Sequence, residues 1–262
     1  MLRPTRATAN GIWRMYEVSE NIIDTTWPIK TDANFANVTV LVHGDDQEGF
    51  AGSLPTTPQH WRNNASGIHS IAWALGSNNN GPALSTGITP KFGSTCIKVN
   101  SFGLGTNGTS TDFQFGTGDF TIEGWFYFTA LAAFNIIDCR ASTASNGAFP
   151  TIYCLSNLGS LRYFVSSADR ITGANGTLTT NTWTHIALSR VSGNTYLYAN
   201  GAQVGATFVD ATNYGSVQGF WGSSSNASPI SGYMQELRVT NGVGRYSGAT
   251  CTVPTSKFAD TA

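Results

Sequence analysis

The stretch WTHIALSRVSGNTYLYANG, residues 183–201, alternates strictly in its first half. Every second residue from Thr184 to Arg190 falls on one face of a strand, and those from Trp183 to Ser189 fall on the other. A strand rises about 3.3 Å per residue, so two residues four positions apart, such as His185 and Ser189, are separated by roughly 13 Å, too far for a nucleophile and its base. The pattern predicts a piece of sheet rather than a catalytic loop.

Two turn signals divide the same stretch. The Ser192-Gly193-Asn194 sequence predicts a turn, and the run from Thr195 to Ala199 is a second strand candidate. Asn200-Gly201 follows, a pair that suits the positive φ angles of a tight hairpin turn. The stretch therefore predicts two strands of a meander.

Short strand candidates continue on both sides of this meander. Seven Asn-Gly pairs punctuate the sequence, and each is a turn candidate. The only helix candidate, a weak one, is Trp13–Ile22. Many short strands with Gly-rich connections predict an all-β fold, an antiparallel two-sheet jelly-roll sandwich with an N-terminal extension. The strand candidates are Val38–Val42, Ile71–Leu75, Thr95–Val99, Phe120–Phe128, Phe134–Cys139, Thr151–Leu155, Leu161–Val165, Trp183–Arg190, Thr195–Ala199 and Gly232–Val239.

Composition excludes several classes of partner. The chain has 262 residues, enough for one large all-β domain or two small ones, and only 11% are charged. A net charge of -1 supplies no basic footprint, so we expect no nucleic-acid partner. No run approaches the roughly 20 apolar residues of a spanning helix, so we expect no membrane insertion. The N-terminal arginines precede no apolar segment, which predicts synthesis in a cytoplasm without a signal peptide.

The strand candidate FTIEGWFYF, residues 120–128, carries aromatic residues on both faces. Such a strand is buried on one side and partly covered on the other. Trp125 is accordingly either a core residue or the floor of a groove.

The cysteines do not indicate a metal or redox site. Cys96, Cys139, Cys154 and Cys251 show no C-x-x-C spacing. Cys139 and Cys154 lie in neighbouring strand candidates and could face each other across a hairpin. In a chain made without a signal peptide, two buried thiols are the favoured state.

Residues 1–35 differ from the rest because they show no strong period and carry tryptophans on a stretch too short to form a core. Such a segment frays unless it docks on something. We therefore divide the chain into an attachment or oligomerisation arm, residues 1–35, and a jelly-roll domain, residues 36–262. The expected anchors of the arm are Trp13, Tyr16, Ile22, Ile23 and Trp27.

Three segments carry a family resemblance: FGTGDFTIEGWFYF (115–128), TNTWTHIALSRVSGNTYLYANGAQVG (180–205) and SGYMQELRVTNGVGRY (231–246). Together they resemble the laminin-G-like, concanavalin-A-like jelly rolls of bacteriophage structural proteins and secreted adhesins. The closing NGVGRY is similar to the phage versions. The resemblance implies a structural virion protein, made in the host cytoplasm, with other virion proteins as partners and copies of itself in a homo-oligomer.

The same resemblance implies a possible calcium ion. Family members often hold Ca²⁺ between an acid near the first strand and oxygens around the last, and the matching positions are Asp45, Asp46 and Glu236. Gln235 stands where the family usually has an acid, which removes a hard oxygen charge that Ca²⁺ prefers. The alternative is that the two aspartates cap a turn and that Glu236 is solvated or paired with Arg238 or Arg190.

Catalytic signatures are missing, so we expect no enzyme. Glycanases on this sandwich need paired carboxylates, and among the fifteen acids only Asp45, Asp46 and Glu48 cluster, before a Gly-rich loop. There is no Gly-x-Ser-x-Gly elbow and no phosphate loop.

Two functions remain. The first is a virion component, a capsid decoration or a tail-fibre-associated protein, attached by its arm. The alternative is a carbohydrate-binding module that recognises host surface glycans through aromatic residues beside polar donors. The candidate sugar-binding residues form two groups: His60, Trp61 and Arg62, and Tyr214, Trp221 and Asn226.

Overall fold

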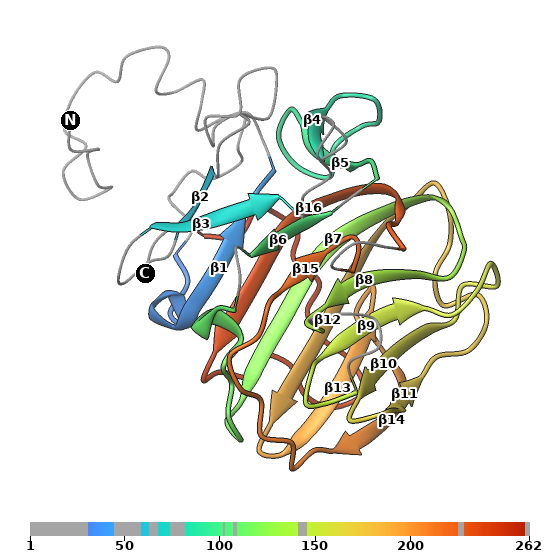
Figure 1. Cartoon of the computed structure of the whole chain (residues 1–262). Coiled ribbons are helices and arrows are strands. Elements are labelled where there is room, and N and C mark those ends of the chain that lie inside the picture. Colours follow the sequence, from blue (N-terminus) through green and yellow to red (C-terminus); the bar gives the residue numbers. More distant parts are fainter. Residues whose placement is uncertain are drawn as a thin grey trace.

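Two antiparallel β-sheets face each other in the computed structural model of the chain, with β7, β12 and β16 behind β8 to β11 in the view of Figure 1. The structure describes residues 31–44, 59–62, 68–73, 82–101, 103–106, 109–140, 146–224 and 228–259, with only the backbone of 59–62, 68–73 and Thr106. The predicted all-β jelly-roll sandwich is confirmed. No helix in these ranges is long and apolar enough to cross a membrane.

The first sheet has the strand order β14-β13-β12-β7-β16-β5-β4, with β1 paired to β16 outside this path. Its long central strands, β7, β12 and β16, are joined in register along most of their length. The strand bounds are β1 Val38–Val42, β4 Ala83–Ser85, β5 Cys96–Val99, β7 Phe120–Ala130, β12 Trp183–Val191, β13 Asn194–Ala199, β14 Ala202–Val209 and β16 Ser231–Asn241.

The second sheet has the order β11-β10-β9-β8-β15-β6-β3-β2. Short 3-10 turns at Phe35–Asn37 and Thr111–Phe113 are the helical elements of the described residues. The strand bounds are β2 Gln59–Arg62, β3 Ile68–Trp73, β6 Leu104–Thr106, β8 Phe134–Asp138, β9 Thr151–Cys154, β10 Leu161–Val165, β11 Ala168–Thr172 and β15 Phe220–Trp221.

The meander predicted from residues 183–201 is confirmed. Ser192 and Gly193 turn between β12 and β13 with φ angles of 49° and 74°. Asn200 and Gly201 turn between β13 and β14 with φ angles of 48° and 85°. Both residues of each turn have positive φ, the backbone conformation that Gly and Asn adopt most readily in tight hairpin turns.

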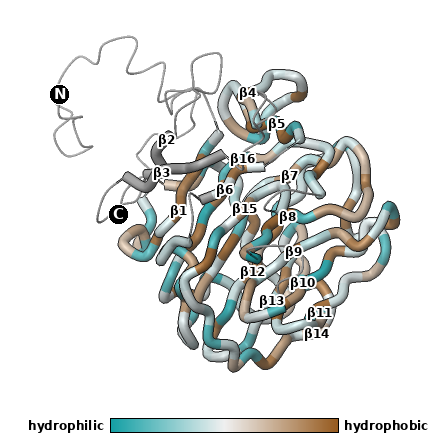
Figure 2. Tube along the Cα trace, viewed as in Figure 1, coloured by the Kyte–Doolittle hydropathy of each residue, from teal (hydrophilic) through white to brown (hydrophobic). Residues whose placement is uncertain are grey.

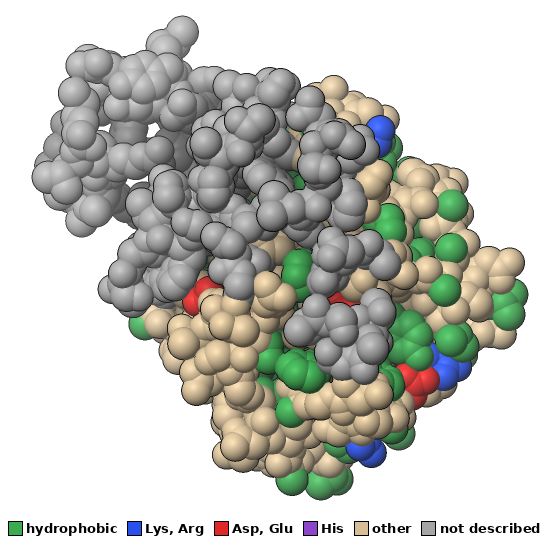
Figure 3. Space-filling model, viewed as in Figure 1, with side chains coloured by type: hydrophobic (Ala, Val, Ile, Leu, Met, Phe, Trp, Pro, Cys, Tyr) green, Lys and Arg blue, Asp and Glu red, His purple; other side chains and the backbone are tan. Residues whose placement is uncertain are grey.

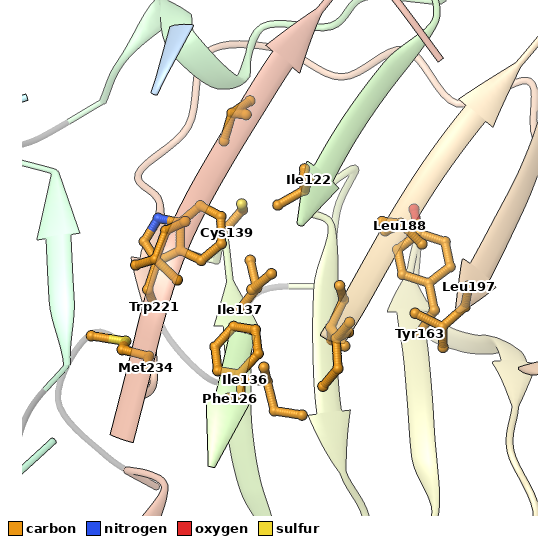
Figure 4. Close-up of a cluster of buried hydrophobic side chains, with 14 of the residues drawn as sticks. Ile122, Phe126, Ile136, Ile137, Cys139, Tyr163, Leu188, Leu197, Trp221 and Met234 are labelled. Carbon is orange, nitrogen blue, oxygen red and sulfur yellow. The ribbon is translucent and has the colours of Figure 1, made fainter. Parts of the chain in front are cut away.

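The core lies between the two sheets and follows the alternation of the strands. Hydrophobic residues, brown in Figure 2, recur along these strands. In β7, Ile122 and Phe126 point inward and are fully buried, while Glu123 and Trp125 point to the outer face. Ile137 from β8 and Leu188 from β12 contribute from the two layers (Figure 4). Each large buried apolar side chain of this kind contributes roughly 1.5–3 kcal/mol through removal from water.

All ten strand candidates correspond to strands, with shifted bounds for most of them. The strands that the sequence did not predict are short or largely exposed, such as β11 and β14 at the sheet edges. The helix candidate at Trp13–Ile22 lies outside the described residues.

The cysteines are free thiols, in agreement with the favoured prediction. Cys139 and Cys154 are buried, and burial raises the pKa of both. Burial also raises the pKa of Cys96 to about 12, so this thiol stays protonated and packs as a small apolar side chain.

Candidate functional site

The outer face of β8 to β11 presents two rows of side chains. A bulge in β8 turns both Ile136 and Ile137 toward the core and leaves Asn135 and Asp138 on the same outer face. Because strand neighbours in register lie side by side, the residues of each row touch across the sheet. The first row is Asn135, Tyr153, Arg162 and Thr172, and the second is Asp138, Thr151, Phe164 and Asp169. We call this surface the cavity face.

A cavity of about 330 Å³ opens between these rows. Its volume is at the small end of the range of roughly 300–1,000 Å³ for small-molecule sites. We call it the Asn135 cavity. It is lined by Asn135, Arg140, Thr151, Tyr153, Phe164 and Ser228, with Ala133, Phe134 and Cys154 completing the wall. The view from this side shows green hydrophobic side chains with few red or blue ones among them (Figure 3).

Asn135 is the unusual residue of the cavity. Its side chain is only 7% exposed, yet its amide forms no hydrogen bond within the described part of the chain. Its backbone N–H, by contrast, donates to the Ser228 carbonyl at 3.0 Å. The buried side-chain N and O atoms that lack a partner belong to other described residues, so the Asn135 amide keeps accessible surface. An accessible amide without a protein partner on the wall of a cavity can hydrogen-bond to water or to a ligand.

Arg140 and Asp138 form a fixed pair at one side of the cavity. The Arg140 guanidinium donates side-on to the fully buried Asp138 carboxylate, from Nε at 2.9 Å and Nη2 at 2.8 Å. Thr151 Oγ1 donates to the same carboxylate at 3.2 Å. The guanidinium carbon lies 5.7 Å from the centroid of the Phe164 ring. A planar cation, a ring and a hydroxyl are therefore held in one geometry.

Tyr153 and Arg162 share one acceptor at the other side. Tyr153 Oη donates to Asp169 Oδ1 at 2.8 Å, and Arg162 Nη1 donates to Asp169 Oδ2 at 2.7 Å. Burial, together with the hydrogen bond to this carboxylate, raises the pKa of Tyr153 to about 12. The phenol is thus a neutral, oriented group at all physiological pH values, and its ring faces the cavity.

The structure corrects the second predicted group of sugar-binding residues. Trp221 is fully buried in the core, near Met234 and Cys139 (Figure 4), and cannot serve as an exposed platform. Tyr214 is also fully buried, with its hydroxyl 2.6 Å from that of Tyr163 and donating to Asp210 at 2.7 Å. Both aromatic side chains pack in the core between the sheets; Trp221 belongs to β15, which pairs with β8 and β6 within the second sheet.

The other candidates of the sugar-binding prediction are not tested. His60, Trp61 and Arg62 form most of β2, whose backbone pairs with β3, but their side chains lie outside the described residues. Asn226 lies outside them as well. The same holds for the predicted anchors of the arm, Trp13, Tyr16, Ile22, Ile23 and Trp27, which stay predictions.

Glu236, the described member of the predicted calcium site, has protein partners, and the calcium site stays a prediction. This residue sits at a bulge of β16 with a φ of 52°, and it is fully buried. Its carboxylate is 2.9 Å from His43 Nδ1 and accepts from the Phe258 backbone N–H at 2.7 Å. This pairing also replaces the predicted alternative of solvation or pairing with Arg238 or Arg190. The described residues contain no cluster of three or more metal-binding side chains, and Asp45 and Asp46 lie outside them.

Gln235 uses its amide in a way that a carboxylate could not. Its Oε1 accepts from the backbone N–H groups of Lys91 and Phe92 at 2.9 and 3.2 Å. Its Nε2 donates to the carbonyls of Phe92 and Thr95 at 2.6 and 3.0 Å. The residue clamps the loop before β5, and the two carbonyls point to an amide donor rather than to a cation.

The outer face of the first sheet is occupied by the protein itself. We call this surface of β7, β12 and β16 the covered face. Glu123 is fully buried there and accepts from Arg238 at 2.6 Å and from Tyr246 Oη at 2.8 Å. Its carboxylate also lies 3.1 Å from His185 Nε2. Burial alone would raise the pKa of Glu123, but the Arg238 charge and the His185 contact hold it well below the ordinary value.

Trp125 lies on the covered face and is 3% exposed. Lys91 Nζ sits 4.0 Å from the centre of its ring, and Phe92 meets the ring edge-on. Trp125 is therefore buried on the outer side of its sheet, under the loop held by Gln235.

The chain belongs to the concanavalin A-like lectin/glucanases superfamily, since the model of that family matches residues 102–243, more than half of its length. The match covers β6 to β16, and so includes every strand of the cavity face. No protein among the curated sequences compared matches the chain.

Solved structures with the same fold have low sequence identity. Domain 4 of AbnA, a GH43 extracellular arabinanase from Geobacillus stearothermophilus in complex with arabinotriose, has a TM-score of 0.53 and 15% identity, over 79% of this chain and 93% of that domain. A Trypanosoma rangeli sialidase has a TM-score of 0.52 and 12% identity, over 79% of this chain and 30% of its own. The binding domain of botulinum neurotoxin DC in complex with SialylT has a TM-score of 0.50 and 13% identity, over 80% of this chain and 49% of its own. These similarities establish the fold alone.

Proposed function

We propose that this chain is a carbohydrate-binding module and that the Asn135 cavity is its binding site. The observation that carries the proposal is the Asn135 amide, which has no protein hydrogen bond in the described residues and lines a cavity together with Tyr153 and Phe164. The family supports it, because its fold is that of lectins and glucanases. The arabinanase domain and the toxin domain, both solved with saccharide-named ligands, add support from the same architecture.

The cavity offers the two kinds of contact that sugars need. A pyranose or furanose ring presents an apolar C–H face and a rim of hydroxyl groups. The Phe164 and Tyr153 rings would pack against the apolar face, as aromatic side chains do in small-molecule sites. The Asn135 amide would accept from one hydroxyl and donate to another, which a hydroxyl pair on adjacent carbons can satisfy together.

The proposal is non-enzymatic. Glycoside hydrolysis requires one carboxylic acid and one carboxylate on either side of the scissile bond. The two carboxylates of the cavity face, Asp138 and Asp169, are each bound by an arginine and a hydroxyl. A carboxylate held in this way is an acceptor already in use.

A role in a virion rests on the sequence resemblance and on the arm, whose first thirty residues lie outside the described ranges. The two roles are compatible, since a decoration or fibre protein can carry a sugar site for adhesion to cells. Asp32, near the end of the predicted arm, is bound to Arg238 and Arg245 on the covered face. Deletion of residues 1–35 followed by an assay of particle incorporation tests the virion role separately.

A glycan-binding screen with the full chain tests the proposal. We expect binding of an oligosaccharide, and we expect Asn135→Ala to weaken it about three- to tenfold, the value of one or two hydrogen bonds. Asn213→Ala is the matched control, because Asn213 is exposed and lies outside the cavity. A screen without binding at high protein concentration, or binding that ignores Asn135→Ala, contradicts the proposal.

A further inference from the structure

The charges of the cavity face cancel in fixed pairs. Arg140 is bound side-on to Asp138, and Arg162 is bound to Asp169. Each pair joins neighbouring positions of the same face, so no uncompensated positive charge points to the Asn135 cavity from the residues that line it. The lining residues other than Arg140 are neutral.

Arg140 is poorly placed to bind an anion. Its Nε and Nη2 are committed to Asp138, and this carboxylate is itself fully buried. A carboxylate ligand would have to compete with Asp138 for the guanidinium and leave a buried charge without its partner. Breaking a buried ion pair in this way is strongly unfavourable, because it leaves a buried charge uncompensated.

The remaining groups of the cavity suit an uncharged ligand. The Asn135 amide is a neutral donor and acceptor, and Tyr153 is held as a neutral phenol with its hydroxyl directed to Asp169. A carboxylate brought beside the amide oxygen and the two aspartates would meet repulsion rather than attraction. Hydroxyl and acetamido groups can instead use both sides of the amide.

We infer that the Asn135 cavity selects neutral sugar units and discriminates against sialylated or otherwise anionic ones. The inference rests on the proposed function, because it names the ligand class of the same site. It also runs against the fold comparisons, in which the sialidase and the toxin domain complexed with SialylT would suggest an acidic sugar. Selectivity follows from the charges of this site, whereas those similarities concern the fold.

Paired probes test the inference on the full chain. Arabinotriose and lactose serve as neutral probes, and sialyllactose is lactose with one added anionic sugar. We expect calorimetric titration to detect a neutral probe and to give an affinity for sialyllactose at least tenfold weaker than for the better neutral probe. The affinity for the neutral probe should change little as the salt concentration rises, because screening acts on charges.

One variant adds a net positive charge to the cavity face and leaves the buried Arg140–Asp138 pair intact. Asp169→Asn leaves Arg162 unpaired on a half-buried surface and gives the face a net positive charge. We expect this variant to lower the ratio of the affinity for the neutral probe to that for sialyllactose severalfold. Asp119→Asn, at a carboxylate outside the cavity, should leave this ratio unchanged.

The outcomes separate the two proposals. Tighter binding of sialyllactose than of lactose by the wild-type chain, lost in Asn135→Ala, overturns the selectivity and leaves the proposed function standing. Binding of none of the probes overturns the neutral preference, and the wider glycan screen then decides the proposed function. Neutral binding that Asn135→Ala does not weaken removes the cavity as the site and overturns both.

Discussion

The two outer faces of the sandwich are built from the same alternation of polar and apolar residues, but one is covered by other segments of the chain and the other carries a cavity. On the covered face, Glu123, Trp125 and His185 lie beneath segments that come from the ends of the chain and from the loop before β5. On the cavity face, Asn135, Tyr153 and Phe164 line an empty volume. Alternation thus predicts that a residue points outward, but the segments that return over the sheet decide whether it meets solvent, protein or ligand.

The covered face is closed by charge pairs as well as by packing. Arg245, from the C-terminal segment, donates to Asp32 at 2.7 Å, and Arg238 from β16 bridges Asp32 and Glu123. Tyr246 completes the cluster through its hydroxyl bond to Glu123. Every charged group of this cluster has a partner, which is the condition for burying charges at acceptable cost. The cavity face differs because the Asn135 amide has no protein partner and stays accessible from the cavity, whereas the unpartnered Trp125 Nε1 and His185 Nδ1 of the covered face are buried.

The largest expected effect belongs to the core that both faces share. Trp221→Ala should lower the free energy of unfolding by about 4 kcal/mol, because it empties a large buried site. Chemical denaturation measures the change, and Leu158→Ala, at a side chain that is 56% exposed, should alter it by less than about 0.5 kcal/mol. If the Trp221→Ala protein kept its stability and lost only glycan binding, Trp221 would be a sugar-binding residue rather than a core residue.

On the covered face, Glu123→Gln should cost about 3 kcal/mol, because Arg238 would lose its main buried counter-charge. Denaturant unfolding of the single variants and of the double variant with Arg238→Met gives the coupling between them. We expect the double variant to lose less than the sum of the two single changes. Additive losses would mean that the pair does not hold this face closed.

A third effect depends on pH. Burial alone would raise the pKa of Asp32, but the hydrogen bond and charge of Arg245 outweigh it and hold the pKa below the ordinary value. A carboxyl with a depressed folded pKa stabilises the fold above its unfolded pKa of about 4 and loses this contribution as pH falls through the folded value. Asp32→Asn should therefore cost about 1.5 kcal/mol at pH 7 and progressively less below about pH 4. A difference that is constant with pH would contradict the charged pairing.

The smallest effect on stability is expected on the cavity face. Asn135→Ala removes a buried amide that makes no hydrogen bond in the described structure, so the free energy of unfolding should stay within about 0.5 kcal/mol or rise. Thermal and denaturant unfolding of the variant, compared with Asn213→Ala, check this. A loss above about 1.5 kcal/mol would show that the amide is structurally satisfied and would weaken the contrast between the faces.

The sequence predicted the strands well because the local pattern there agrees with the global fold. In β7 and β12 the apolar face is continuous, and at Asn200-Gly201 the backbone requirement of the turn is local. The edge strand β11, ADRIT, was missed because its pattern is polar and mostly exposed. The other edge strand, β14, alternates, but Gly205 and small residues such as Ala202 weaken its strand signal. Trp125 could not be placed, because its cover comes from Lys91 and Phe92, which no local pattern links to it.

The candidate site was not predictable from local patterns. Asn135 and Asp138 share a face only because a bulge breaks the alternation of β8. Phe164 and Thr151 meet through strand register, and Arg140 reaches the ring from beyond the end of its strand. Trp221, one of the tryptophans chosen from the sequence, has a side chain suited to sugar binding. It is fully buried instead, because so large an apolar side chain is stabilised more by packing in the core.

A crystal structure of the full chain with a neutral oligosaccharide bound tests the central claim most directly. The account predicts a sugar ring against Phe164 and Tyr153, with hydroxyl oxygens within about 3.2 Å of the Asn135 amide. Density for the sugar at another place, with the Asn135 cavity filled only by water, would contradict it.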